Sequence, residues 1–322
     1  MRNMKSNYLF LLILILTLSC EESDTETTDE PDNEIIDDYN LLAVSNLGEV
    51  FEIGNNTGIL EKIGQIEREN NNSILSTNNL IASNNKIYCI EYIYNPSPTN
   101  NLLIFDRQNN TTERVPLTLP SNITGDERGI IALAWNNNNL IGVLGENVII
   151  DNFTKHIINI NLEDYIITDL GITFNEEDKI TSMEKIDSKL YLSTWGDGFL
   201  EIDLTNKSVN NVNSINGSRL AKINESEVAI MQSVPGFING AKPARINLSN
   251  YIISDNSTDE IYGLVTLFGN SIYENQIYLN LVSTSDLYFG ILKTNFQNNE
   301  SSIVEINSTS VDRNLIILDT TN

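Results

Sequence analysis

Histidine is almost absent from this chain, and the single one is His156. We expect His156 to be an inert, exposed residue at the edge of an outer strand. Mechanisms that pair serine or cysteine with a histidine base are therefore not supported. Zinc and copper sites built from several histidines are excluded, because one histidine cannot supply them. No catalytic residue is predicted.

Basic residues are also scarce. The chain has 19 Lys and Arg against 44 Asp and Glu, which gives a formal net charge of −25 at pH 7. Such an acidic surface repels a phosphate backbone, and no stripe of Lys or Arg interrupts it. We therefore predict that nucleic acid is not a partner, whereas cations and neutral molecules remain compatible with the charge.

Cysteine occurs only twice, at Cys20 and Cys89. Cys89 lies in a strand-like apolar run and is predicted to be a small buried residue. Cys20 follows a segment with the features of an export signal. Basic residues near the start are followed by the apolar stretch Tyr8 to Leu18, and the small residue Ser19 precedes the cysteine. This order is typical of an export signal, and the apolar stretch falls short of the roughly 20 residues that a spanning helix needs.

The segment Thr17-Leu18-Ser19-Cys20 resembles the cleavage site of bacterial lipoprotein signal peptides. This resemblance implies that Cys20 becomes the mature N-terminus and carries acyl chains such as palmitate, so that the membrane is a partner through the lipid. Thr17 departs from the family, in which Leu is usual. An ordinary cleaved secretory signal or an N-terminal membrane anchor are the alternatives.

Residues 21–38 contain ten acidic residues and no Lys or Arg. Like charge and little apolar surface prevent such a segment from forming a core. We predict a signal peptide at 1–19, an acidic flexible tether at 20–38 and a folded domain at 39–322. Acidic residues after a lipidated cysteine resemble a signal for surface display in some Gram-negative bacteria, which implies a lipid-anchored protein on the outer face of the outer membrane. The alternative is a solvated spacer.

One pattern of four short strands returns about every 35 to 50 residues, separated by Asn, Asp and Ser turns, with a third strand that ends in Asp or Asn. Almost no helical periodicity is present, so the fold class is all-β. The pattern predicts antiparallel four-stranded blades at Ser73–Leu119, Gly129–Ile160, Ile180–Val212, Ser218–Asp255 and Tyr262–Ile306. In the second of these, the third strand is predicted at Val148–Asp151.

The two ends of the chain supply a sixth blade. Three strands are predicted near the N-terminus, at Asn40–Ser45, Glu49–Gly54 and Ile59–Gln65, and one near the C-terminus, at Asn314–Asp319. Joining them closes a ring and removes exposed sheet edges. We therefore predict a six-bladed β-propeller closed by N- and C-terminal strands. A seven-bladed propeller or a pair of β-sandwiches are the alternatives.

The segment from Lys189 to Asp203, with Trp195-Gly196-Asp197-Gly198 at its centre, resembles the propeller repeats of two-component-regulator sensors. Only this copy matches well. The resemblance supports the architecture and implies no sensory function, since a fold by itself does not carry one.

Long connections on one face of the propeller are the predicted binding site, because loops on a rigid scaffold are where sites are built. They include 92–101, 164–178 and 233–243, while the opposite face carries short turns such as Asn55 to Gly58. Aromatic residues there suit a sugar ring or a peptide. The candidate ligand-binding residues are Tyr92, Tyr94, Trp195, Asp197, Phe237 and Lys242. Alternatively, Trp195 and Phe237 fill gaps between blades.

We expect a non-enzymatic protein that binds an extracellular glycan or protein, without a cofactor. The alternative is a calcium-dependent hydrolase or lyase of six-bladed propeller type, since oxygen ligands suit Ca²⁺. The segment from Asp255 to Asp259 places oxygens as a calcium loop does at its start. Glu260 then stands where such a loop needs Gly, and Thr266 where it needs Glu, so no metal ligand is predicted.

Overall fold

In the computed structural model, the folded part of the chain begins at Ile36. Its described residues are 36–69, 74–93, 98–147, 153–176, 180–194, 198–212, 214–237, 240–255, 261–264, 270–283, 289–306 and 315–321. Every regular element among them is a β-strand. In this part of the chain, no helix is long and apolar enough to cross a membrane. The lipidation candidate Cys20 lies outside the described residues.

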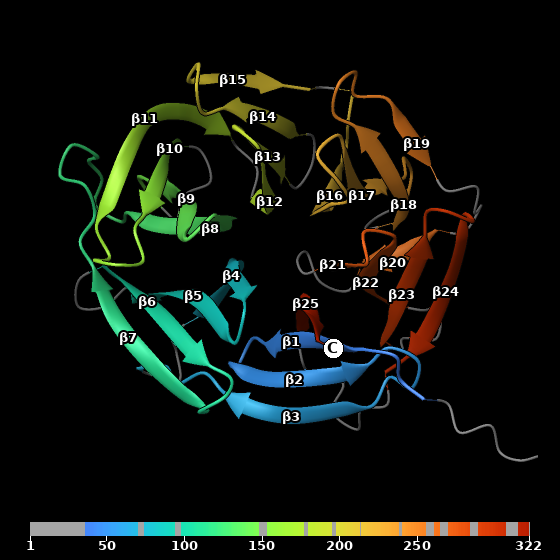
Figure 1. The fold of residues 1–322 in the computed structure, drawn as a ribbon. Helices are drawn as coiled ribbons and strands as arrows, with labels where there is room; N and C mark the ends of the chain where they lie inside the picture. Colours follow the sequence, from blue (N-terminus) through green and yellow to red (C-terminus); the bar gives the residue numbers. More distant parts are fainter. Residues whose placement is uncertain are drawn as a thin grey trace, which may run out of the picture. The chain divides into compact units, whose positions relative to one another are not determined.

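Six antiparallel blades follow one another around a common centre (Figure 1). Blade 1 contains β25 (Leu315–Thr321), β1 (Asn40–Ser45), β2 (Glu49–Gly54) and β3 (Leu60–Gln65). Blade 2 contains β4 (Ile74–Ser83), β5 (Lys86–Ile93), β6 (Thr99–Asp106) and β7 (Thr111–Leu117). Blade 3 contains β8 (Gly129–Asn136), β9 (Asn139–Gly145), β10 (Phe153–Ile160) and β11 (Ile167–Glu176).

The second half of the chain repeats the arrangement. Blade 4 contains β12 (Ile180–Ile186), β13 (Lys189–Thr194), β14 (Phe199–Asp203) and β15 (Ser208–Asn211). Blade 5 contains β16 (Gly217–Lys222), β17 (Glu227–Ser233), β18 (Gly240–Asn247) and β19 (Ile253–Asp255). Blade 6 contains β21 (Asn270–Tyr273), β22 (Ile277–Ser283), β23 (Phe289–Asn295) and β24 (Glu300–Glu305), and β20 (Tyr262–Leu264) pairs with both β18 and β22.

Blade 1 is built from both ends of the chain. The red strand β25 lies at the inner edge of the blue N-terminal strands (Figure 1) and pairs antiparallel with β1, with Ser45 opposite Leu315 and Asn40 opposite Thr321. β1 is thus hydrogen-bonded on both sides, to β25 and to β2. The predicted six-bladed propeller with closure by N- and C-terminal strands is confirmed.

The hydrophobic core lies in the seams between neighbouring blades. Each of the six seams between described blades holds one cluster of buried side chains. Strand β9 shows why: Leu140 and Leu144 pack toward blade 2, whereas Ile141 and Val143 pack toward blade 4. Successive side chains of a strand point to opposite faces of its sheet, so an inner blade strand must be apolar on both faces.

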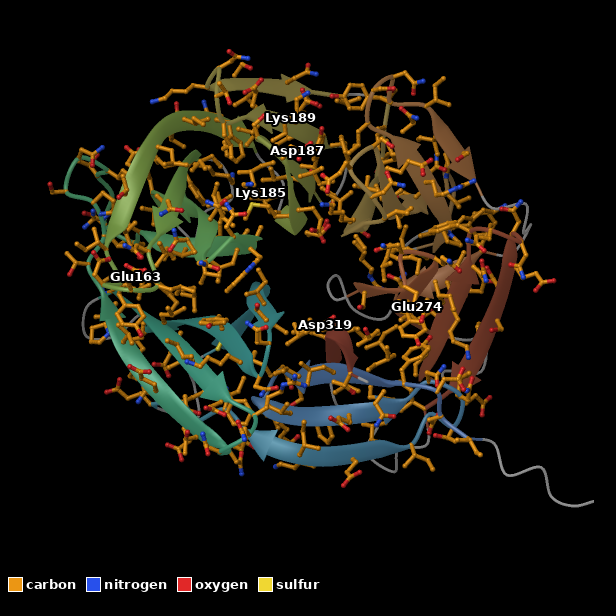
Figure 2. All side chains as sticks on the ribbon, viewed as in Figure 1. Glu163, Lys185, Asp187, Lys189, Glu274 and Asp319 are labelled. Carbon is orange, nitrogen blue, oxygen red and sulfur yellow. The ribbon has the colours of Figure 1, made fainter. Side chains whose placement is uncertain are left out.

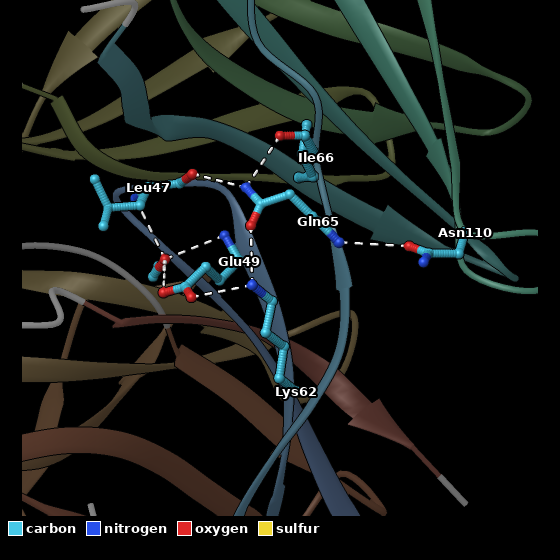
Figure 3. A network of polar contacts seen from close by, with 7 residues as sticks. Leu47, Glu49, Lys62, Gln65, Ile66 and Asn110 are labelled. Atoms are coloured by element: carbon cyan, nitrogen blue, oxygen red, sulfur yellow. Dashed lines mark hydrogen bonds and ion pairs between the residues drawn. The ribbon is translucent and has the colours of Figure 1, made fainter. Parts of the chain in front are cut away.

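Polar contacts complete the seams at the outer strands. Between blades 1 and 2, the Asn110 side-chain oxygen accepts a hydrogen bond from the Gln65 backbone N–H at 3.4 Å (Figure 3). The Gln65 side-chain amide donates to the Leu47 carbonyl oxygen at 2.9 Å, and Lys62 Nζ lies 3.1 Å from Glu49 Oε1. The hydrogen bond to Asn110 ties a turn of blade 2 to the outer strand of blade 1, and the other two contacts hold that strand within its own blade.

Two predictions for blade 3 are wrong. The sequence places the third strand at Val148–Asp151, which lies outside the described residues. The strand between β9 and the outer strand β11 is β10. The predicted loop 164–178 is consequently occupied by the outer strand β11 over most of its length. The apolar run 148–151 satisfies the same strand pattern as β10, so periodicity alone cannot separate the two.

The same shift changes the environment of the single histidine. His156 lies on β10 between β9 and β11 and is only 8% exposed, so the predicted exposed position at the edge of an outer strand is wrong. Its Nε2 lies 3.0 Å from Glu146 Oε1. A third strand is paired on both sides, which buries a side chain that an outer strand would expose.

Candidate functional site

An open pocket of about 550 Å³ lies where blades 1 and 6 meet. Blade 1 and the chain just before it contribute Asp38, Tyr39, Asn55 and Asn56. Blade 6 contributes Tyr273, Lys293, Asn298, Glu300, Ser301 and Ser302. The lining comes from the turns after β2, β21 and β23, which join first to second and third to fourth blade strands. The pocket therefore opens on the short-turn face, opposite the face with the predicted long loops.

Two tyrosines form the aromatic part of the pocket. The rings of Tyr39 and Tyr273 are stacked, with centroids 3.8 Å apart and an interplanar angle of 18°. Tyr39 is buried, and burial raises the pKa of its hydroxyl to about 12, although Asn55 acts in the opposite direction. Tyr273 is partly exposed, and its neighbour Glu274 lies in the β21–β22 turn of blade 6 (Figure 2). The stack thus offers the ring of Tyr273, supported from behind by the buried Tyr39, and such an aromatic surface suits an amphipathic ligand.

The ammonium group of Lys293 lines the same pocket as the two tyrosines. Lys293 projects from β23 and its Nζ donates to the Asn56 side-chain oxygen at 2.8 Å. Burial lowers the pKa of Lys293, while the carboxylates of Asp38 and Asp37 partly oppose that effect. The pocket therefore combines one ammonium with the carboxylates of Asp38 and Glu300, and amides surround all three.

The turn that forms one wall belongs to a series. In blades 2 to 6, the third strand leads into a turn whose first residue is Asp or Asn, and the side-chain oxygen of that residue accepts the N–H two residues later. The five first residues are Asp106, Asn161, Asp203, Asn247 and Asn295. The fifth turn residue has a positive φ in every blade; these residues are Gly58, Asn110, Tyr165, Lys207, Tyr251 and Asn299. Asx side chains stabilise such turns locally.

Blades 2 and 4 each show the full version of this turn, with three hydrogen bonds to the Asp side chain. Asp203 Oδ1 accepts from the N–H groups of Thr205 and Asn206 at 2.8 and 2.9 Å, and Asp203 Oδ2 accepts from the Asn206 side chain at 2.8 Å. These hydrogen bonds lower the pKa of Asp203, chiefly the one from the Asn206 backbone. One carboxylate therefore satisfies three donors.

In blade 1, three hydrogen bonds at the same turn positions are accepted by a residue from outside the turn. Its turn begins with Gly54, which has no side chain to offer. Asp37 Oδ1 accepts instead from the N–H groups of Asn56 and Thr57 at 2.7 and 3.0 Å, and Asp37 Oδ2 accepts from Thr57 Oγ1 at 2.6 Å. Although partial burial alone would raise it, the pKa of Asp37 is lowered by the hydrogen bonds from Thr57 and Asn56. Asp37 falls within the segment that the sequence predicts to be a tether.

The candidate residues from the sequence are only partly described. Tyr92 lies on β5 and is partly buried, Lys242 lies on β18 opposite Gln232, and Phe237 is 59% exposed in the β17–β18 connection. Tyr94, Trp195 and Asp197 lie outside the described residues. Blades 2 and 5 stand on opposite sides of the centre (Figure 1), so a shared binding rim for this set stays a prediction.

The pocket was not predictable from loop length. The turn Asn55 to Gly58 looks like a simple connection, and Tyr39, Tyr273 and Lys293 are far apart in sequence. The sequence does contain one signal. In blades 2 to 6 the turn after the third strand begins with Asp or Asn, whereas in blade 1 it begins with Gly54. Among the described residues, no group of three His, Cys, Asp or Glu side chains is arranged to hold a metal ion.

Comparison with known proteins gives similarity in fold only. No protein-family model matches the sequence, and no curated protein is detectably similar to it. TolB from Acinetobacter baumannii matches with a TM-score of 0.58 and 9% identity, over 88% of this chain and 66% of TolB. Puromycin hydrolase matches with a TM-score of 0.53 and 7% identity, over 84% of this chain and 46% of the hydrolase. The chain thus spans less than two thirds of either protein.

A third similar structure is the extracellular domain of a proposed hybrid two-component system from B. thetaiotaomicron. It has a TM-score of 0.48 and 13% identity, over 86% of this chain and 34% of that chain. A TM-score this low supports no conclusion about the function of this chain. The resemblance of Lys189–Asp203 to two-component-regulator propellers therefore supports the propeller architecture alone.

Proposed function

We propose that this protein is a lipid-anchored, surface-exposed β-propeller of the outer membrane that binds an extracellular glycan in the pocket between blades 1 and 6. The observation that carries the glycan proposal is the lining of that pocket. It combines stacked tyrosines, Tyr39 and Tyr273, with amides, hydroxyls and the ammonium of Lys293. Ligand pockets commonly pair such an apolar surface with a few fixed polar groups.

The charges favour a neutral sugar over an anionic one. Lys293 is offset within the same pocket by the carboxylates of Asp38 and Glu300, and the chain as a whole carries a net charge of −25. Asn and Ser side chains both donate and accept hydrogen bonds, which matches the hydroxyl groups of a sugar. A protein partner remains the alternative, with the long-loop face around Phe237 as its surface.

Glycan arrays probed with the full-length chain in detergent test the proposal. We expect Tyr273→Ala to weaken binding by about tenfold or more, as removal of a central aromatic contact does. Phe237→Ala is the matched control, because it removes an exposed aromatic residue from the opposite face. Loss of binding in Phe237→Ala with retention in Tyr273→Ala would place the site on the long loops and contradict the pocket.

The anchor has its own test. Acyl chains contribute roughly 0.8 kcal/mol per buried methylene to membrane binding, so a multiply acylated Cys20 holds the protein stably. We expect Cys20→Ala to move the protein from the membrane fraction to the medium, with Cys89→Ala as the control that stays in the membrane. Recovery of Cys20→Ala in the membrane fraction would exclude the lipid anchor.

A further inference from the structure

In the turn of blade 1, the carboxylate of Asp37 fills the space that a side chain at Gly54 would need. A Cβ atom added at Gly54 would lie 2.1 Å from Asp37 Oδ2 and 2.3 Å from Thr57 Oγ1. No positive φ restricts Gly54, so its backbone itself would accept another residue. What excludes a side chain at position 54 is the Asp37 carboxylate together with the Thr57 hydroxyl that donates to it.

We infer that Asp37 is a positioning residue of the pocket, which supplies the missing turn carboxylate and so fixes the chain that forms the pocket wall. Its hydrogen bonds hold Asn56 and Thr57 in the turn. The residues that follow Asp37 are Asp38 and Tyr39, and both line the pocket. The consequence for ligand binding rests on the function proposed above, whereas the structural role of Asp37 does not.

Asn56 connects this carboxylate to the pocket. Its backbone N–H donates to Asp37, its side-chain oxygen accepts from Lys293 Nζ, and its side-chain amide donates to the Ile36 carbonyl oxygen at 3.0 Å and to Asp38 Oδ1 at 3.3 Å. The Asp38 N–H in turn donates to the Asn55 side-chain oxygen at 3.2 Å. Each of these hydrogen bonds joins the β2–β3 turn either to residues 36–38 or to β23.

A carboxylate suits the position better than a neutral acceptor. Three donors converge on Asp37, two backbone N–H groups and one hydroxyl, and hydrogen bonds to a charged acceptor are the stronger ones. Asp203 in blade 4 meets the same three kinds of donor positions, and it does so from within its own turn. The two turns therefore place a carboxylate against donors at the same positions, and they differ in the origin of the carboxylate and in the third donor, which is the Asn206 amide in blade 4 and the Thr57 hydroxyl in blade 1.

The test is a cycle of variants in the full-length chain in detergent. Asp37→Ala removes the carboxylate, Gly54→Asp introduces a second one where the first already stands, and the double variant returns a carboxylate to the usual first position of the turn. Hydrogen–deuterium exchange of peptides spanning 36–45 and 52–60 measures the turn and the preceding segment separately. Asp203→Ala is the control that breaks the equivalent turn far from the pocket.

We expect each single variant to raise exchange of the Asn56 and Thr57 amides by about tenfold, which is the size of effect that loss of one charged hydrogen bond gives. In the double variant, the Thr57 hydroxyl can rotate away from the new side chain, and protection of the turn should return. Protection of residues 36–38 should not return fully, because the carboxylate of residue 37 no longer joins them to the turn and only their hydrogen bonds with Asn55 and Asn56 are left. If Asp37→Ala leaves exchange unchanged, or if turn protection fails to return in a double variant that stays folded, the inference is overturned.

A second readout separates positioning from general stability. Hydroxyl-radical footprinting reports the accessibility of Tyr39, which is 4% exposed in the intact structure. We expect severalfold more labelling of Tyr39 in Asp37→Ala and in the double variant, and no change in Asp203→Ala. Unchanged labelling in the double variant would show that Asp37 has no role in forming the pocket wall. Neither readout uses a glycan, so a failed glycan array and a failed role of Asp37 remain distinguishable.

Discussion

Blades 4 and 1 build the same turn from different parts of the chain. Blade 4 is continuous from β12 to β15, and its turn carboxylate, Asp203, is the last residue of its own third strand. Blade 1 is assembled from both ends of the chain, and its turn carboxylate, Asp37, precedes the first strand. The difference teaches that a repeat can keep the hydrogen bonds of its turn without keeping the residue that makes them, provided that another segment reaches the same point.

The largest expected effect comes from undoing the assembly of blade 1. Deleting residues 315–322 removes β25 and leaves β1 without a partner on its inner side, which exposes backbone donors and acceptors of β1 and takes the buried side chains of Leu315, Ile316 and Ile317 out of the core. We expect loss of cooperative thermal unfolding and aggregation on purification, because an open propeller presents sheet edges. Deletion of Asn322 alone is the control and should behave as the intact chain. A soluble, cooperatively folded chain without 315–322 would contradict the requirement for closure.

A smaller effect is expected from the fifth residue of the two turns. Gly58 and Lys207 both have positive φ, at 63° and 54°. A Cβ at position 58, however, would lie 1.9 Å from the Glu305 carbonyl oxygen. We expect Gly58→Ala to lower the free energy of unfolding by about 1–3 kcal/mol in urea titrations, since backbone must move to admit the methyl group. Lys207→Ala should change it by less than about 0.5 kcal/mol. Equal effects of the two substitutions would show that the seam between blades 6 and 1 tolerates a side chain there.

The smallest effect concerns carboxylates on the first strands of the same two blades. In blade 4, burial raises the pKa of Glu184 on β12 to about 7, although Lys222 acts in the opposite direction. In blade 1, burial raises the pKa of Asp319 on β25, which lies near the centre in Figure 2. A raised pKa of an acid means that the folded state holds its proton more tightly than the unfolded state. The contribution of this group to the free energy of unfolding is therefore greatest below the pKa of the unfolded state, and it is lost as the pH rises through the pKa of the folded state.

For Glu184 this window runs from its ordinary value of 4.5 to about 7. We expect Glu184→Gln to raise the melting temperature by about 2–4 °C at pH 8 relative to the parent chain, and to change it little at pH 4.5. Differential scanning calorimetry across this range measures the effect, with Asp319→Asn as the comparison in blade 1. Equal melting temperatures of Glu184→Gln and the parent chain at both pH 4.5 and pH 8 would contradict the burial of the Glu184 carboxyl group.

The sequence predicted those parts of the fold that depend on neighbouring residues. The strands of blade 4 follow from alternating apolar residues and from turns such as Asp203 to Lys207, and the closure follows from three strands at one end and one at the other. Blade 3 was predicted less well, because two apolar runs, 148–151 and 153–160, compete for one strand position. Local pattern cannot choose between them, whereas pairing with β9 and β11 does.

The candidate site was harder to predict for a related reason. Its tyrosines, Tyr39 and Tyr273, come from opposite ends of the chain and meet only because the ring closes between blades 6 and 1. Asp37 is one of many acidic residues in its segment, and nothing in the sequence distinguishes it from the others. Only the absence of a side chain at Gly54 marks the place where a carboxylate from outside the turn is needed.

The placement of β1 has a mechanical consequence. A pull on the chain before Ile36 reaches the Asp37 carboxylate first and then β1, which is paired with β2 on one side and with β25 on the other. An edge strand under load can peel away one hydrogen bond at a time, but β1 can leave only if two ladders open together. A pulling force applied from the predicted anchor at Cys20 therefore acts on a strand that is hydrogen-bonded along both edges.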